Sequence, residues 1–142
     1  MRHSKKIRLS LCLALLVAAA ACNRNANPPA GTAGVRVTDV TLGKAVGGDK
    51  AITDRADSFK PNDTIYASVA TEGSAQSATL RAKWSFENGQ LVDESTRAIA
   101  PANKERTEFH ISKPDGWPAG KYKLEVFLND QLAETKNFDV GS

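Results

Sequence analysis

The sequence of 142 residues predicts an all-β fold, a single antiparallel β-sandwich of about seven strands over residues 34–142. Three observations lead to this prediction. Short segments of alternating apolar and polar residues recur at a spacing of about 8–12 residues, which is typical of sandwiches. Turn-forming Gly, Pro, Asn and Asp separate these segments, and Asn88-Gly89 is a strong signal for a tight hairpin. No segment of the domain shows a sustained helical period of 3.6 residues.

The first half of the domain contains two predicted strands with an irregular segment between them. Residues 35–43 alternate, and their apolar positions change register midway: Val35, Val37, Val40 and Leu42. Residues 43–57 are Gly-rich and polar, so we expect a loop, a short edge strand or both. After a turn at Pro61-Asn62-Asp63, the second strand has one predicted core face: Ile65, Ala67 and Val69.

The second half is predicted as two hairpins, over residues 78–96 and 121–140, with one strand over residues 106–112 between them. Asn88-Gly89 turns the first hairpin and Asn129-Asp130 turns the second. Alternation assigns thirteen side chains of these segments to the core: Leu80, Ala82, Trp84, Phe86, Thr107, Phe109, Ile111, Tyr122, Leu124, Val126, Leu128, Phe138 and Val140.

Two aromatic residues point to a particular kind of sandwich. Trp84 lies in the middle of an apolar strand face, where a large ring fills the gap between two sheets. Tyr122 begins a strand two residues after Gly120, and this placement resembles the tyrosine corner of immunoglobulin-like (Ig-like) sandwiches. Leu124 stands where antibody domains have a cysteine. The resemblance is therefore to disulfide-free Ig-like domains, such as fibronectin type III modules.

Two longer segments carry a second resemblance. "FKPNDTIYASV" and "DGWPAGKYKLEVFLND" are similar to Ig-like modules of bacterial lipoproteins of uncharacterised function, and they cover about a quarter of the domain. These segments consist of strand and turn residues. The resemblance therefore implies an architecture and does not indicate an activity.

The N-terminus, residues 1–21, has the features of a secretory signal peptide. Four basic residues precede a short uncharged apolar segment, "LSLCLALLVAAAA", which is shorter than the roughly 20 residues of a membrane-spanning helix. "AAAC", which ends at Cys22, resembles the lipobox of bacterial lipoproteins, although Ala19 stands where Leu is usual. The resemblance implies that Cys22 is acylated. The alternative is an ordinary signal cleavage near Ala20 or Ala21, with Cys22 incidental.

Residues 22–33 comprise this cysteine and a predicted flexible tether. The segment has no apolar periodicity and contains Pro28-Pro29, which favours an extended polyproline II conformation. Asn23 follows the cysteine, and the resemblance to sorted lipoproteins implies export to the outer membrane, because Asp at this position retains enterobacterial lipoproteins in the inner membrane. We expect a lipid-anchored protein of the cell envelope that faces the periplasm.

The charge of the mature chain excludes an obvious nucleic-acid partner. Four of the 19 Lys and Arg residues precede Cys22, which leaves 15 against 16 Asp and Glu and a net charge of −1. No basic patch or run of like charge appears in the domain.

The residues that usually carry catalysis or bind metals are scarce in the domain. It has no cysteine, no methionine and one histidine, His110, which alternates with apolar neighbours and is predicted to face solvent. Asp93-Glu94 are adjacent strand residues, so their carboxylates point to opposite faces. Asp54, Asp57 and Asp63 do not have the spacing of an EF-hand. We expect no enzymatic activity, no metal and no cofactor.

Two aromatic residues remain as candidate contacts for a partner. Phe127 alternates out of phase with the core positions beside it, and Trp117 lies in the loop "KPDGWPAG". Each is a candidate exposed anchor, because aromatic residues dominate binding hot spots. The alternatives are that Trp117 forms a lid over the end of the core and that Phe127 packs across strands.

Taken together, the sequence predicts a non-enzymatic binding or assembly module of the envelope, anchored to the membrane through lipid. Its partner would be an envelope protein or a polysaccharide. An alternative is a periplasmic inhibitor of a protease or lysozyme-like enzyme, which would insert a projecting loop into the enzyme. A third possibility is a small hydrolase or sugar-binding domain, with aromatic residues exposed beside a polar groove.

Overall fold

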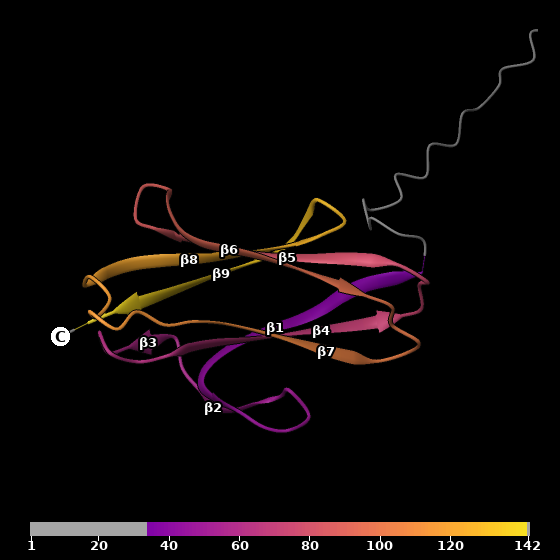
Figure 1. Ribbon diagram of the computed structural model, residues 1–142, viewed down its shortest axis with the longest axis horizontal. Coiled ribbons are helices and arrows are strands. Elements are labelled where there is room, and N and C mark those ends of the chain that lie inside the picture. Colours follow the sequence, from indigo (N-terminus) through magenta and orange to yellow (C-terminus); the bar gives the residue numbers. More distant parts are fainter. Residues whose placement is uncertain (1–33, 142) are drawn as a thin grey trace, which may run out of the picture.

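The computed structural model describes residues 34–141, which form two β-sheets packed face to face (Figure 1). The predicted signal peptide, Cys22 and the tether lie outside the described residues. Residues 34–141 contain no helical segment with the length and apolar character that a membrane crossing needs. The predicted all-β fold is confirmed.

Nine strands make up the two sheets of the described chain. The four-stranded sheet has the order β2-β1-β4-β7, and the five-stranded sheet has the order β3-β9-β8-β5-β6. Every pairing is antiparallel except that of β3 with β9. The strands are β1 (Val35–Val46), β2 (Ile52–Arg55), β3 (Ser58–Phe59), β4 (Ile65–Gly73), β5 (Ala78–Phe86), β6 (Gln90–Ile99), β7 (Glu105–Ile111), β8 (Gly120–Leu128) and β9 (Gln131–Val140).

The structure has two short strands in addition to the seven predicted ones. β2 lies in the Gly-rich segment where a loop or short edge strand was expected. β3 has two residues and pairs only with Asp139 and Val140 at the end of β9. Alternation cannot predict a strand of two residues, because two residues show no periodicity. Such a strand forms because its distant partner is available for pairing.

The register change expected in the first strand is a β-bulge. Val37 pairs with Thr71 and Asp39 pairs with Ala70, so Thr38 is an extra residue in β1. The bulge restores the inward direction of the later apolar residues, and both Val40 and Leu42 are buried in the core.

The core lies between the sheets and is centred on Trp84, whose side chain is fully buried. Its ring packs edge-on against Phe138, with centroids 5.9 Å apart. The thirteen side chains that alternation assigned to the core are buried, except that Phe86 is only partly buried. Phe86 is the last residue of β5, and its ring packs against Tyr122 with centroids 4.8 Å apart. The nearby bulge in the β5–β6 pairing lies in β6, where Val92 is the extra residue, so β5 keeps its alternation.

Tyr122 forms the predicted tyrosine corner. Its ring is 2% exposed, and its hydroxyl donates a hydrogen bond to the backbone carbonyl of Pro118 at 2.7 Å. Burial, together with the nearby charge of Glu87, raises the pKa of the Tyr122 phenol. With this corner and the two packed sheets, the domain is an Ig-like sandwich, as the sequence predicted.

The two predicted hairpin turns differ in detail. Asn129 and Asp130 both have positive φ angles, of 48° and 65°, as a tight two-residue turn requires. In the other turn, positive φ angles fall on Glu87 and Gly89, at 41° and 96°. Asn88 does not take the conformation that the sequence suggested, because the turn closes Phe86 onto Gln90 and so spans three residues.

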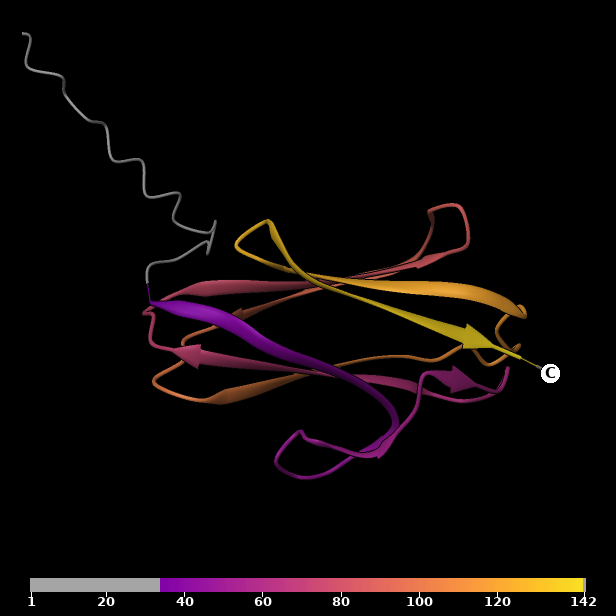
Figure 2. The same cartoon turned by 180° about the vertical axis from the view of Figure 1, so that it is seen from behind.

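The sandwich has two distinct ends. β1 begins at the end that holds the β8–β9 turn, whereas the chain finishes at the opposite end (Figures 1 and 2). Figure 2 shows β1 and β9 running side by side in the same direction, and each is the second strand of its sheet, next to the short edge strand β2 or β3.

Candidate binding surfaces

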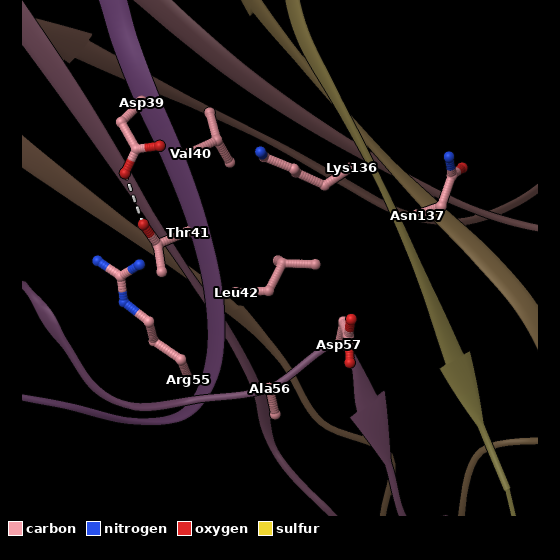
Figure 3. A pocket seen from close by; sticks show the side chains of 9 residues that line it. All are labelled: Asp39, Val40, Thr41, Leu42, Arg55, Ala56, Asp57, Lys136 and Asn137. Atoms are coloured by element: carbon pink, nitrogen blue, oxygen red, sulfur yellow. Dashed lines mark hydrogen bonds between the residues drawn. The ribbon is translucent and has the colours of Figure 1, made fainter.

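A groove of about 470 Å³ lies between the edges of β1 and β9 (Figure 3). Asp39, Thr41 and Arg55 lie on its β1 side, and Lys136 and Asn137 lie on its β9 side. The crossing segment at residues 56–57 closes one end of the groove. Its inner surface includes two core residues, Val40 and Leu42.

The groove is polar and carries charges of both signs. Asp39 and Asp57 provide the two carboxylates of the groove, and the hydroxyl of Thr41 donates a hydrogen bond to Asp39 at 2.6 Å (Figure 3). Arg55 has no ion pair within residues 34–141, and the ammonium of Lys136 lies 3.7 Å from Glu134. Neither an imidazole nor a thiol lines this groove. The arrangement offers hydrogen bonds and charge to a ligand, without a nucleophile–base pair.

A second surface, the Phe127 patch, is defined by Arg81, Phe127 and Leu132 on the outer face of the five-stranded sheet. Phe127 is half-buried and pairs with both other residues, Arg81 on β5 and Leu132 on β9. The guanidinium carbon of Arg81 lies 4.1 Å from the centroid of the Phe127 ring. Leu132 is 53% exposed, so the patch places an aliphatic, an aromatic and a cationic group together at the surface.

The geometry of the patch bears on the class of ligand. Sugar-binding sites on flat sheets stack a sugar ring against an open aromatic face. Here one face of Phe127 is covered by Arg81, which also forms ion pairs with Glu94 at 3.1 Å and Asp130 at 3.6 Å. These contacts hold the guanidinium over the ring. The patch therefore matches a protein contact better than a sugar platform.

Trp117, the other candidate anchor, is 7% exposed and forms part of the core. Its backbone N–H donates to the carbonyl of Pro61 at 2.7 Å, and its indole N–H donates to the carbonyl of Asp63 at 3.1 Å. The exposed anchor that the sequence suggested is thus not found at Trp117. The indole closes one end of the core, as the lid interpretation described.

The turn that receives Trp117 is itself held by Asp63. The carboxylate of Asp63 accepts a hydrogen bond from the backbone N–H of Lys60 at 2.8 Å and lies 3.2 Å from the ammonium of Lys44. The Lys60 hydrogen bond, with a contribution from Lys44, lowers the pKa of Asp63, although partial burial opposes the shift. Asp63 therefore stabilises a turn and has no ligand-binding geometry.

His110 faces solvent on the outer face of the four-stranded sheet, as alternation predicted. Its Nδ1 lies 2.5 Å from the carboxylate of Glu108, and its ring lies 5.5 Å from that of Tyr66. Sequence reasoning did not note this pair, although residues two apart in a strand share a face. Within residues 34–141, no group of three or more His, Cys, Asp or Glu side chains is placed to hold a metal ion.

The residue that sequence reasoning missed is Leu132. The predicted turn at Asn129-Asp130 could have indicated its pairing, because a two-residue turn places Leu128 opposite Gln131. The next pair would then be Phe127 with Leu132, as the structure shows. Its exposure has no such signal, because alternation does not predict how far a hairpin extends beyond the core.

Comparisons with known proteins support the fold. No protein-family model matches the sequence, and no curated protein matches it either. Among solved structures, the C-terminal domain of Wzt is similar, with a TM-score of 0.55 and 11% identity over 79% of this chain and 76% of that one. At such identity the similarity shows a shared fold alone.

Two further similarities are weaker. An immunoglobulin-like protein from Pseudomonas aeruginosa has a TM-score of 0.49 and 18% identity over 75% of this chain and 96% of that one. The alkylpurine DNA glycosylase AlkC from Pseudomonas fluorescens, bound to DNA, has a TM-score of 0.49 and 13% identity over 76% of this chain. The chain spans only 30% of the AlkC chain.

Proposed function

We propose that this protein is an envelope lipoprotein, acylated at Cys22, whose Ig-like domain is a non-enzymatic module that binds a partner protein through the Phe127 patch. The patch is the observation that carries the proposal. Aromatic and arginine side chains dominate protein-binding hot spots, and Leu132 adds exposed apolar surface beside them. The polar residues around the patch would form the rim of such an interface.

The sequence alone supports the proposed lipid anchor at Cys22. The "AAAC" motif at Cys22 follows a signal-like segment and precedes a Pro-containing tether. On this proposal, the protein sits on the periplasmic face of the outer membrane, with its domain held away from the lipid by residues 22–33.

The other functions considered from the sequence have less support. An inhibitor would need a projecting loop, but the loop around Trp117 is hydrogen-bonded back onto the domain at Pro61 and Asp63. A sugar-binding site at Phe127 would need Arg81 to move away from the ring. We therefore do not propose either one.

The two exposed leucines of the described chain provide a matched test. Leu132 is 53% exposed within the patch, and Leu91 is 55% exposed on a different strand of the same sheet. Detergent-solubilised envelope would be passed over the immobilised wild-type protein, Leu132→Asp and Leu91→Asp, and the retained proteins identified.

We expect one protein to be retained by wild type and by Leu91→Asp, and lost with Leu132→Asp. A partner retained equally by all three proteins would refute the assignment of the patch. If wild type retains no protein in this experiment or after cross-linking in intact cells, the binding function itself is refuted.

A further inference from the structure

The groove between β1 and β9 is bounded by strand edges that are only partly paired. β2 pairs with β1 from Gly43 onward, and β3 pairs with β9 only at Asp139 and Val140. Before Gly43 in β1 and before Asp139 in β9, the edge that faces the groove has no partner strand within residues 34–141. Open strand edges present unpaired backbone donors and acceptors that can bind another chain.

Two hydrogen bonds show which backbone groups face the groove. The carbonyl of Leu42 accepts a hydrogen bond from Ala56 at 3.1 Å, and the N–H of Asp139 donates to Asp57 at 2.9 Å. Both groups therefore point away from the paired neighbour, β4 or β8. Backbone groups alternate along a strand, so the residues two positions earlier, Val40 and Asn137, point to the same side.

The crossing segment already shows how an extended chain fits this space. Residues 56–59 run from the edge of β1 to the edge of β9 and form backbone hydrogen bonds with both. The groove of Figure 3 lies directly beside this segment. There, Val40 and Asn137 are the next residues whose backbone groups point toward the space between the strands. The segment thus fills one half of a continuous space between two strand edges and leaves the other half open.

We propose that the open half of this space binds a short extended segment of a partner protein, which adds as a strand to the free edge of β9. This site lies apart from the Phe127 patch and goes beyond the function proposed above. Backbone hydrogen bonds at the sheet edge would provide binding, and the alternating side chains of the segment would provide selectivity.

Two bulges limit the length of the added segment. Thr38 is the extra residue in β1, and Ala133 is the extra residue in β9, between the partners of Val126 and Phe127. Regular edge is left only at residues 39–42 and 134–137. A segment of about four residues, or about 13 Å of strand, fits between the bulges and the crossing segment.

The lining of the groove indicates the side chains of the segment. Inward side chains would meet Val40 and Leu42, and apolar residues suit these positions. Arg55 has no ion pair within the described chain, whereas the ammonium of Lys136 lies 3.7 Å from Glu134. Asp39 and Asp57 supply the negative charges of the lining, and the hydrogen bond from Thr41 leaves the charge of Asp39 in place. An acidic side chain on the outward face of the segment is therefore the favoured neighbour of Arg55.

The first measurement is amide hydrogen exchange of the mature chain, Cys22 to Ser142, in detergent micelles. We expect the amides of Val40 and Asn137 to exchange rapidly. The adjacent amides of Thr41 and Lys136 should be protected, because they point toward β4 and β8. Slow exchange at Val40 and Asn137 would show that these groups are already hydrogen-bonded or covered in the protein on its own, which would overturn the proposal.

The second measurement uses acetyl-Thr-Val-Glu-Val-amide as the probe in NMR titrations. We expect shifts at the amides of Val40 and Asn137, a weaker response when Lys replaces the Glu of the probe, and none when the probe is N-methylated at alternate residues. Equal binding of the N-methylated probe, or no shift at millimolar concentration, would overturn the proposal. Neither outcome bears on the Phe127 patch, whose amides lie elsewhere.

A pair of variants completes the test. Asn137→Pro removes the outward N–H, a position at which edge strands tolerate proline, whereas Asn137→Ala changes only the side chain. We expect the proline variant to bind the probe about tenfold more weakly or not at all, and the alanine variant to bind like wild type. Equal binding by a folded Asn137→Pro would contradict the proposed strand addition.

Discussion

Removing one hydroxyl tests the packing at the tyrosine corner. In Tyr122→Phe, the carbonyl of Pro118 loses a donor at 2.7 Å while the ring can remain buried. Leaving a buried acceptor unpaired costs about 1–3 kcal/mol. Pro118 itself is exposed, so water can partly replace the hydroxyl. We therefore expect the free energy of unfolding to fall by about 1–2 kcal/mol.

The assay is urea unfolding of wild type, Tyr122→Phe and the control Lys121→Ala at pH 7. Lys121 and its partner Asp139 form an ion pair at 3.3 Å, but both side chains are largely exposed. The control should therefore stay within about 0.5 kcal/mol of wild type. The urea dependence should be the same for all three proteins, because the exposed surface on unfolding does not change.

The pKa of Tyr122 provides a second measurement at the corner, because it reports the burial of the phenol. Burial raises this pKa in the folded state above its ordinary value of 10.0, so the folded state favours the neutral phenol. Its contribution to stability is fully present below pH 10 and is lost as the pH rises through the folded pKa. The advantage of wild type over Tyr122→Phe should therefore shrink above pH 10. A variant that is as mild as Lys121→Ala at pH 7 and keeps the same difference at high pH would refute this account of the corner.

Three further predictions follow from other parts of the chain. Cys22→Ser should move the protein from the detergent phase to the aqueous phase in phase partitioning, because the variant cannot be acylated and each buried acyl CH₂ contributes about 0.8 kcal/mol to membrane binding. An unchanged partition would refute acylation. The melting temperature of residues 33–142 should not change with reductant or chelator, and a drop of several degrees with chelator would reveal a metal site. Gly120→Ala should lower the free energy of unfolding by about 1–3 kcal/mol, because a Cβ there would lie 2.7 Å from the Phe86 ring. Gly48→Ala has open space around the new Cβ, so its free energy of unfolding in the same urea assay should stay close to that of wild type.

Local patterns were enough to predict much of the fold. Alternation identified the buried face of β4, and the position of Tyr122 after Gly120 identified the corner. These features depend on residues close together in the chain. The parallel pairing of β3 with β9 does not, because it joins Ser58 to Asp139 across 81 residues. No local signal marks such a pair, and the groove beside it could not have been predicted for the same reason.

The bulges at Thr38 and Ala133 are also invisible to sequence-based prediction, and they bear on the proposed strand addition. A bulge exists only relative to a partner strand, so neither Thr38 nor Ala133 stands out in the sequence. Yet both interrupt the open edges that flank the groove, and they do so at the same end of the sandwich. An open edge of full length would expose the domain to uncontrolled pairing with other chains. An edge that is regular for about four residues between a bulge and the crossing segment can instead accept one short strand and no more.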